Sequence, residues 1–520
     1  MKWLNEKHEF SLEEKRMVNK SAQFKNMTKH IRQVPEYIIR EEEKLTAASP
    51  FRQKFHIEAK SGFLNDPNGF SFFNGKYHLF YQWTPLAFKQ DPPIWHHGWY
   101  HIASLDLINW EDLGPAIESD TELDKHGTYS GSAIVIDDKL FCIYTGNTWT
   151  NTQTDNWRRL PYQVGAWMDE YNQFKKIDKP LIIDTFADCT GHFRDPKIWK
   201  HANDYYAILG AQRKDLTGTA KIIKSEGHDL TKWQKYGELK TGEANLGYMW
   251  ECPDYFELNG QGVLLFSPQG LSPKDNYFQN VYQTGYFIGE PLNYENLDFK
   301  HGQFHELDAG FDFYASQTLE APDGRRIMMA WFGISEMEYP TTKYHYSGCL
   351  TIPRELIVED KKLLQRPIVE LEKLRKKEKK ADILIDSMTE LDTTENVTQE
   401  LDFEVNLGSA DSFVLDLRAN QDNSQHTRLI IDRKNQYCIL SRKESGISFA
   451  EKYGTERKRK FKFGQNLRVH IFVDVSSVEI FIGKGEVVFS ARIFPNDNQT
   501  KIFAQSIGGK SQLTGKVWDL

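Results

Sequence analysis

The sequence predicts an all-β protein, in which a five-bladed β-propeller is followed by a C-terminal β-sandwich and preceded by a short helical N-terminal extension. Three observations lead to this prediction. A pair of apolar strands joined by a tight turn recurs along the chain, in five copies. Beyond residue 383 apolar residues alternate with polar ones, and before residue 48 the chain is charged and helix-prone. A strand repeat of this length is typical of a radial array of small sheets, so five copies indicate five blades.

The predicted N-terminal extension covers residues 1–48, with candidate helical faces at 13–16 and 38–43. We expect it to pack against the repeats and hold them together. The first residues, which include several charged side chains, lack the apolar core that a signal peptide requires.

The repeats occupy the predicted propeller domain, residues 49–358. The first strands of the five copies are at 66–73, 130–136, 194–199, 251–256 and 316–319. Three copies have an acidic residue at the start of this strand: Asp66, Asp195 and Glu251. Because the innermost strands of a propeller surround its axis, the three carboxylates are expected to meet in one funnel.

A connector with a helix is predicted at 359–382, since Ile368, Leu371 and Leu374 have helical spacing after Pro367. The lysine-rich stretch 373–380 is interpreted as the solvated end of that helix. Residues 383–520 form the predicted sandwich. Its strands show period-two alternation, as at Leu467, Val469, Ile471 and Val473, and its expected role is accessory.

Composition narrows the possible functions. The net charge of -8, from 65 basic and 73 acidic residues, argues against nucleic-acid binding. The five cysteines have no paired spacing, which favours a reducing compartment and a cytoplasmic location. No run of eighteen apolar residues occurs, so we expect no membrane span.

Each acidic residue has an ordinary interpretation when taken alone. Asp66 starts an Asp-Pro-Asn-Gly turn, and Asp195 follows Arg194 as a local ion pair would. Their shared position in the repeat instead favours a catalytic role, because glycoside hydrolysis uses two carboxylates with different pKa values. Asp66, in a turn rich in backbone donors, is the expected ionised partner, and Glu251, beside Trp250, the protonated one. Asp195 is expected to stay charged and to bind hydroxyl groups.

Several motifs together resemble glycoside hydrolase family 32, the β-fructofuranosidases. These motifs are at 65–69, 81–82, 129–133, 193–197, 250–254 and 313–317. The resemblance implies a small-molecule sugar substrate, with Asp66 as nucleophile, Glu251 as general acid/base and Asp195 as stabiliser of the transition state. It also implies a fructose pocket lined by Asn65, Gln82, Tyr129, Ser130, Arg194 and Trp331.

The chain departs from the family pattern near residue 100, where Trp99-Tyr100-His101 replaces the usual Trp-Gly-His, and the preceding loop 88–97 is longer. His97 and His101 are four residues apart, but a third metal ligand in phase is missing, so no metal and no cofactor are expected.

The leading hypothesis is a retaining hydrolase that releases a terminal β-D-fructofuranosyl unit from sucrose 6-phosphate or sucrose. A cytoplasmic location favours the phosphorylated sugar. The alternatives are a fructosyltransferase that uses the same site, a fructan exo-hydrolase, and a sugar-binding propeller without activity. Four cationic or titratable side chains are candidate phosphate contacts, although each is also an ordinary surface group: Lys89, Lys125, His126 and Lys343.

Overall fold

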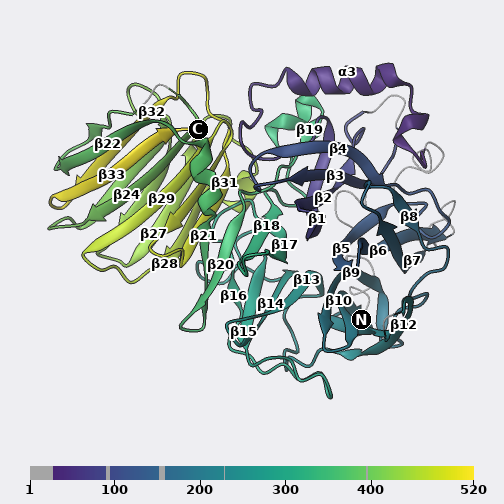
Figure 1. Ribbon diagram of the computed structural model, residues 1–520. Helices are drawn as coiled ribbons and strands as arrows, with labels where there is room; N and C mark the ends of the chain where they lie inside the picture. The colour runs from purple at the N-terminus through teal and green to yellow at the C-terminus, as the bar shows by residue number, and fades with distance from the viewer. Residues whose placement is uncertain (1–26, 90–93, 151–157, 228, 394–395) are drawn as a thin grey trace, which may run out of the picture.

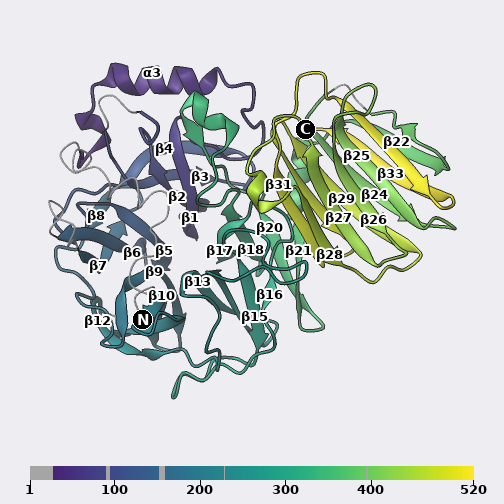
Figure 2. The same cartoon turned by 180° about the vertical axis from the view of Figure 1, so that it is seen from behind.

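The computed structural model describes residues 27–89, 94–150, 158–227, 229–393 and 396–520. Within this part of the chain the strands form seven sheets. Figures 1 and 2 show two lobes side by side, a larger one built from the first five sheets and a smaller one built from the last two. The protein is therefore mostly β, as predicted.

The five sheets of the larger lobe follow one another along the chain. The first contains β1 (Gly62–Phe73), β2 (Lys76–Thr84), β3 (Gly98–Ser104) and β4 (Trp110–Ile117), with the short β19 (Tyr346–Ser347) added parallel to β1. The second contains β5 (Thr128–Ile136), β6 (Lys139–Thr150), β7 (Arg158–Met168) and β8 (Phe174–Lys176). The third contains β9 (Cys189–His201), β10 (Asp204–Arg213), β11 (Gly218–Glu226) and β12 (Asp229–Glu238). The fourth contains β13 (Met249–Leu258), β14 (Gln261–Gln269), β15 (Gly285–Gly289) and β16 (His305–Glu306). The fifth contains β17 (Tyr314–Glu320), β18 (Arg326–Trp331), β20 (Arg354–Glu359) and β21 (Lys362–Pro367).

The first strands of these sheets lie next to one another. β1 contacts β5, β5 contacts β9, β9 contacts β13, β13 contacts β17, and β17 returns to β1. Buried apolar side chains fill the space between successive sheets, for example Phe141 and Phe193 between the second and third. Side chains near the start of each first strand are thereby brought toward one centre.

Turn residues define where the hairpins begin and end. Asn74 and Gly75 join β1 to β2 with φ values of 47° and 76°, the left-handed pair that a two-residue hairpin turn requires. Asp360 and Lys361 join β20 to β21 in the same way, with φ values of 49° and 59°. The fifth sheet therefore continues to Pro367, beyond the expected boundary at residue 358.

The connector between the lobes is shorter than the expected 359–382. It contains the 3-10 helix η3 (Val369–Leu374), where helical spacing was predicted, and Leu371 of this helix is buried. The lysine-rich stretch is not a helix end, because β22 (Lys376–Ile385) begins there and pairs with β33 at a sheet edge. Lysine is frequent on exposed edge strands, where its charge opposes pairing with other chains.

The smaller lobe consists of two six-stranded sheets. One contains β22, β33 (Ser511–Asp519), β24 (Gln399–Asn406), β29 (Asn466–Asp474), β30 (Ser477–Ile482) and β31 (Val487–Arg492). The other contains β23 (Thr389–Glu390), β32 (Lys501–Ile507), β25 (Ser412–Ala419), β26 (His426–Asp432), β27 (Tyr437–Glu444) and β28 (Glu456–Lys460). The 3-10 helix η4 (Glu451–Tyr453) precedes β28.

Alternation in β29 explains how the two lobes fit together. Leu467, Val469 and Ile471 point into the apolar core of the smaller lobe, as predicted. Phe472, on the opposite face of the strand, is also fully buried, together with Phe481 of β30, in the apolar cluster of the first and fifth sheets. One face of this sheet therefore packs against the larger lobe.

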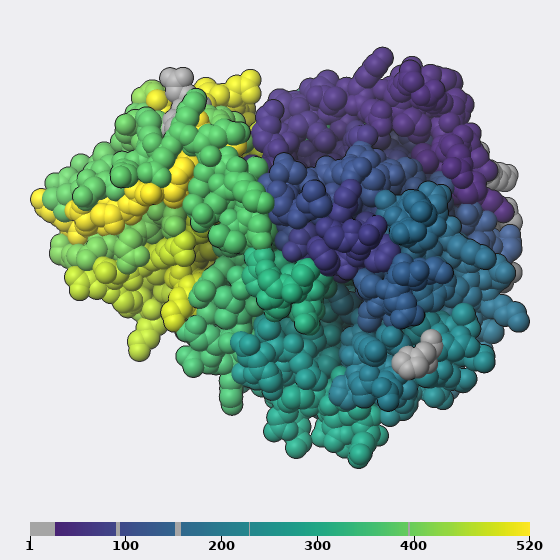
Figure 3. Space-filling view, viewed as in Figure 1, coloured from purple at the N-terminus to yellow at the C-terminus, as the bar shows by residue number. Residues whose placement is uncertain are grey.

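The described part of the N-terminal extension contains the 3-10 helix η1 (Ile31–Gln33) and the helix α3 (Glu36–Ala47). The candidate helical face at 13–16 lies outside the described residues. Ile38, Glu42 and Thr46 form one buried face of α3, and Glu42 is 2.7 Å from Nδ1 of His345, next to the 3-10 helix η2 (Pro340–Tyr344). Figure 3 shows this segment, in purple, along the edge of the larger lobe. With its twelve residues α3 does not meet the requirements of a membrane span, nor does any other described helix.

Candidate active site

The three predicted carboxylates lie on first strands of different sheets, Asp66 in β1, Asp195 in β9 and Glu251 in β13. Cys252 links them. Its backbone N–H donates a hydrogen bond to Oδ2 of Asp195 at 3.0 Å, and its Sγ lies 3.9 Å from Oδ2 of Asp66. Asp66 and Asp195 are each 6% exposed. The structure therefore brings the three acidic groups together in one cluster, in which Asp66 and Asp195 are buried and Glu251 is partly exposed.

Irregularities in the first strands direct these side chains. The pairing register shifts between Leu64 and Pro67 in β1 and between Glu251 and Asp254 in β13. Asp195 and Cys252 have φ values of 64° and 46°, in the left-handed region that non-glycine residues rarely adopt. Bulges of this kind re-aim a side chain next to a functional site, and left-handed backbone stores strain there.

Asp66 is held by side-chain amides. Nε2 of Gln82 donates to its Oδ1 at 2.9 Å, and Nδ2 of Asn68 donates to its Oδ2 at 3.2 Å. Gln82 also donates to Oγ of Ser130. Burial raises the pKa of Asp66 to about 8, and the negative charge of Asp195 adds to this effect. The expectation of an ionised Asp66 is therefore wrong for the free protein at neutral pH, because burial outweighs the hydrogen-bond donors.

The pKa of Asp195 is shifted less than that of Asp66. Burial raises its pKa to about 6, and the positive charge of Arg194 opposes this rise. Nε of Arg194 is 3.9 Å from Oδ2 of Asp195. At pH 7 Asp195 is thus mainly charged, as expected, and its charge is one reason why Asp66 retains a proton.

Both oxygens of Glu251 accept hydrogen bonds. Nε and Nη2 of Arg194 donate to Oε1 at 3.1 and 2.6 Å. Nε2 of Gln269 and the hydroxyl of Tyr314 donate to Oε2 at 2.7 and 2.5 Å. Sequence reasoning assigned neither Gln269 nor Tyr314 to the site. Tyr314 lies in the motif 313–317 and is the first residue of β17, so its position in the repeat was a usable signal, whereas Gln269 ends the second strand β14 and gave none.

The structure places the other predicted pocket residues around this cluster. Asn65 is buried in β1 beside Asp66. The ring of Tyr129 is buried at the start of β5. The ring of Trp331 meets that of Tyr314 edge-on at 6.4 Å between centroids, so it lies one side chain away from Glu251.

His97 and His101 do not share a site. His97 contacts Gln82 and Thr84, whereas Nε2 of His101 lies 2.9 Å from Nδ1 of His78. Among the described residues we find no group of three or more His, Cys, Asp and Glu side chains placed to hold a metal ion. The five cysteines, all within the described ranges, are free thiols.

Three of the four candidate phosphate contacts have other roles. Nζ of Lys125 pairs with Glu122 at 3.0 Å. Nδ1 of His126 accepts a hydrogen bond from the backbone of Trp149 at 2.7 Å, and burial lowers its pKa to about 4, so the ring is neutral. Lys343 lies over the ring of Tyr344, against the N-terminal segment. Among the described residues we find no comparable contact for the side chain of Lys89, which is partly buried.

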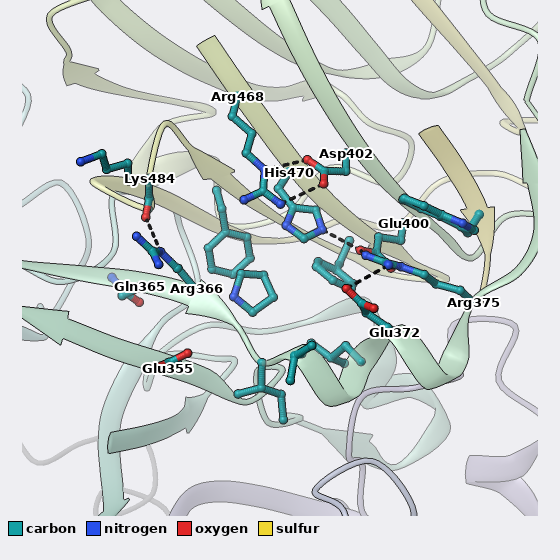
Figure 4. Close-up of a pocket in the computed structure, with 18 of the residues that line it drawn as sticks. Glu355, Gln365, Arg366, Glu372, Arg375, Glu400, Asp402, Arg468, His470 and Lys484 are labelled. Atoms are coloured by element: carbon teal, nitrogen blue, oxygen red, sulfur yellow. Dashed lines mark hydrogen bonds and ion pairs between the residues drawn. The ribbon is translucent and has the colours of Figure 1, made fainter. Parts of the chain in front are cut away.

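A second hollow, of about 410 Å³, lies between the lobes, lined by β20, β21 and η3 on one side and by the smaller lobe on the other. Figure 4 shows that several of its charged groups pair with one another. Arg468 binds Asp402 through two hydrogen bonds of 2.8 Å, and Arg375 binds Glu400 at 2.7 and 2.8 Å. Against the effect of burial, these hydrogen bonds lower the pKa of Glu400 and of Asp402. Burial instead raises the pKa of Asp66 and of Asp195, as is typical of groups that exchange protons, so the cluster around Asp66 is the better candidate for an active site.

Comparison with known proteins agrees with this choice. Residues 56–367 match the model of the glycosyl hydrolases family 32 N-terminal domain, and residues 370–519 match the family 32 C-terminal model. The chain is 38% identical over 475 residues to a sucrose-6-phosphate hydrolase of Pediococcus pentosaceus, which covers 91% of each chain. It is 36% identical to the Bacillus subtilis enzyme of the same name, covering 93% of this chain and 97% of that one.

Solved structures give the same result. A sucrose-6-phosphate hydrolase from Lactobacillus gasseri superposes with a TM-score of 0.85 at 34% identity, covering 94% of this chain and 97% of that one. A family 32 β-fructofuranosidase from Bombyx mori gives a TM-score of 0.77 at 31% identity, covering 94% and 99%. The chain therefore belongs to family 32 of the glycosyl hydrolases and is a glycoside hydrolase.

Proposed function

We propose that this family 32 enzyme is a retaining β-fructofuranosidase that releases a terminal fructosyl unit from sucrose 6-phosphate or sucrose. The observation that carries the proposal is the joining of Asp66, Asp195 and Glu251 through Cys252 in one cluster. The names of the relatives, sucrose-6-phosphate hydrolase and β-fructofuranosidase, support the choice of sugar.

The proposal includes an interpretation of the fold. We take the five sheets whose first strands contact one another in turn as the five blades of a propeller, with its axis passing through the carboxylates. The catalytic domain then covers residues 49–367. Among the described residues, the sandwich that starts at β22 contributes none to the carboxylate cluster, so we assign it an accessory role.

In the first step the carboxylate of Asp66 attacks the anomeric carbon of the fructosyl unit. Glu251 transfers its proton to the glycosidic oxygen as the bond to the leaving sugar breaks. The donors on both oxygens of Glu251 hold its carboxyl group in one orientation. A fructosyl ester on Asp66 and a free leaving sugar result.

Before the attack the proton on Asp66 must move to Glu251, so that the reacting form has a charged Asp66 and a protonated Glu251. Hydroxyl groups of the bound sugar can donate hydrogen bonds to Asp66 and Asp195, and such donors favour the charged form of a carboxylate. Positive charge that develops at the anomeric carbon in the transition state favours it further. Asp195, mainly ionised at pH 7, adds negative charge at the same place.

In the second step water attacks the fructosyl ester, and Glu251 now accepts the proton from that water. Asp66 is released as a carboxylate. Two successive inversions at the anomeric carbon give overall retention, so the fructose released first has the β configuration.

The test is a rapid NMR assay of the first product together with steady-state kinetics on sucrose, sucrose 6-phosphate and inulin. We expect β-fructofuranose first and the highest kcat/KM for sucrose 6-phosphate. Initial release of the α anomer would remove Asp66 from the nucleophile role. Products longer than the substrate at high sucrose concentration would identify a fructosyltransferase, and a preference for inulin would identify a fructan exo-hydrolase.

A further inference from the structure

His97 contacts none of the three carboxylates, yet it is bound to the residue that holds Asp66. Its imidazole is fully buried. Nε2 meets the amide oxygen of Gln82, and Nδ1 lies 2.7 Å from Oγ1 of Thr84. The amide nitrogen of the same Gln82 donates to Oδ1 of Asp66 at 2.9 Å and to Oγ of Ser130. A continuous chain of hydrogen bonds thus runs from Thr84 through His97 and Gln82 to Asp66.

The direction of this chain follows from which atoms can donate. The amide oxygen of Gln82 only accepts, so Nε2 of His97 must carry a hydrogen. Burial lowers the pKa of His97 to about 3, and the neutral ring has only one N–H. Nδ1 therefore accepts from the hydroxyl of Thr84. The amide oxygen of Gln82 thus determines the tautomer of His97, and the hydroxyl of Thr84, which can donate or accept, completes the hydrogen bond at the other nitrogen.

The packing around the ring keeps it in this orientation. The imidazole stacks on Trp95 with an interplanar angle of 14° and meets the ring of Tyr129 edge-on at 5.5 Å between centroids. The backbone oxygen of His97 accepts a hydrogen bond from the N–H of Thr128, at 3.2 Å. His97 is thus attached to the start of β5, the strand that carries Tyr129 and Ser130.

We propose that His97 is a positioning residue, which keeps the amide of Gln82 turned so that its N–H group, and not its oxygen, faces Asp66. Without the donor at Nε2 the amide can rotate by half a turn. The oxygen of Gln82 then faces a carboxylate and the charged form of Asp66 loses a hydrogen bond. This inference rests on the proposed role of Asp66 as nucleophile.

The experiment compares three variants of the full-length enzyme. His97→Leu removes the donor. His97→Gln restores an N–H near the position of Nε2. His101→Leu is the matched control, because His101 is also buried, four residues along the chain, but pairs with His78 outside the carboxylate cluster. Each variant is assayed for kcat, KM, the pH profile of kcat/KM and Tm.

We expect kcat of His97→Leu to fall by about 10- to 100-fold, the effect of one lost hydrogen bond to a charged group, with little change in KM. His97→Gln should recover most of this loss, and His101→Leu should keep the parent kcat. The acid limb of kcat/KM should move to higher pH in His97→Leu alone. Asp195, Glu251 and the Cys252 thiol also face Asp66, but all three are unchanged in every variant, so they cannot account for a difference between variants.

Equal kcat and an unshifted acid limb in His97→Leu and His101→Leu would overturn the inference and leave His97 a structural role. Failure of His97→Gln to recover activity, in a variant with the parent Tm, would also contradict it. A further variant, Asp66→Ala, distinguishes an error in the role of His97 from an error in the proposed function. An active Asp66→Ala enzyme refutes the nucleophile, whereas an inactive one beside an unaffected His97→Leu refutes only the positioning role.

Discussion

Replacing Asp66 by asparagine should abolish turnover and at the same time stabilise the fold. Burial and the charge of Asp195 raise the pKa of Asp66 from an ordinary 3.8 to about 8, so the folded protein holds a proton that the unfolded chain releases. Between these two values the folded state binds more protons than the unfolded state, and stability falls as pH rises. Asparagine is neutral at every pH and does not carry this cost.

The size of this stability cost follows from the pH range between the ordinary pKa of Asp66 and pH 7. From pH 3.8 to pH 7 the cost grows by about 1.4 kcal/mol per pH unit, which amounts to about 4 kcal/mol at pH 7. Part of this gain will be lost because the new amide side chain changes the hydrogen bonds of Gln82 and Asn68. We therefore expect a net gain on the order of 2–4 kcal/mol at pH 7 that shrinks by about 1.4 kcal/mol per pH unit toward lower pH and is zero or negative near pH 4.

The assay is denaturant unfolding of both proteins from pH 4.5 to pH 8, following the transition that includes the larger lobe. Asp474→Asn is the control, since Asp474 is an equally buried carboxylate whose pKa is lowered by His56 and by backbone donors, and its replacement should destabilise. The raised pKa should also be seen in the kinetics. On the acid side, kcat/KM should begin to fall well above pH 4, at an apparent pKa that describes the interacting carboxylates as a group. An Asp66→Asn protein that is less stable than the parent at pH 7, or a difference independent of pH, would refute the reasoning.

Three other predictions concern Glu251, His56 and the effect of removing metal ions. Glu251→Ala should be nearly inactive on sucrose, but azide, or a substrate with a very acidic leaving group, should restore part of kcat because protonation then matters less; equal loss on good and poor leaving groups would contradict the acid role. His56 lies between Asp474 and Glu479 at 2.8 and 2.9 Å, and these two carboxylates raise its pKa from 6.5 to about 9 against the effect of burial. Its ion pairs should add about 3 kcal/mol of stability below pH 6.5 that is lost as pH rises through 9, so the urea midpoints of His56→Gln and the parent should converge above pH 9. Dialysis against EDTA should leave kcat unchanged, because carboxylates supply both the nucleophile and the proton; activity restored by one divalent ion would argue otherwise.

The repeat pattern was sufficient to predict where the carboxylates gather, because position within a strand repeat determines which side chains reach the centre. Domain limits were harder to predict. The hairpin at Asp360 and Lys361 lacks glycine, so its turn was not recognised, and the lysines after residue 375 gave no apolar alternation that would mark an edge strand. Protonation was least predictable, because it depends on burial. Asp66 has donors nearby in sequence, but its burial beside Asp195 decides its pKa.

Strain in the first strands connects the fold to its chemistry. Asp195, Cys252 and Ala315 have φ values of 64°, 46° and 49°, and each lies within a register shift of its strand. A regular strand would alternate its side chains between the two faces of the sheet. At Cys252 the left-handed turn instead places the backbone N–H toward Asp195 while Glu251, the preceding residue, meets Arg194. The packed sheets on either side supply the stability that holds these unfavourable conformations, so groups that would repel one another in solution can be kept together where the first strands meet.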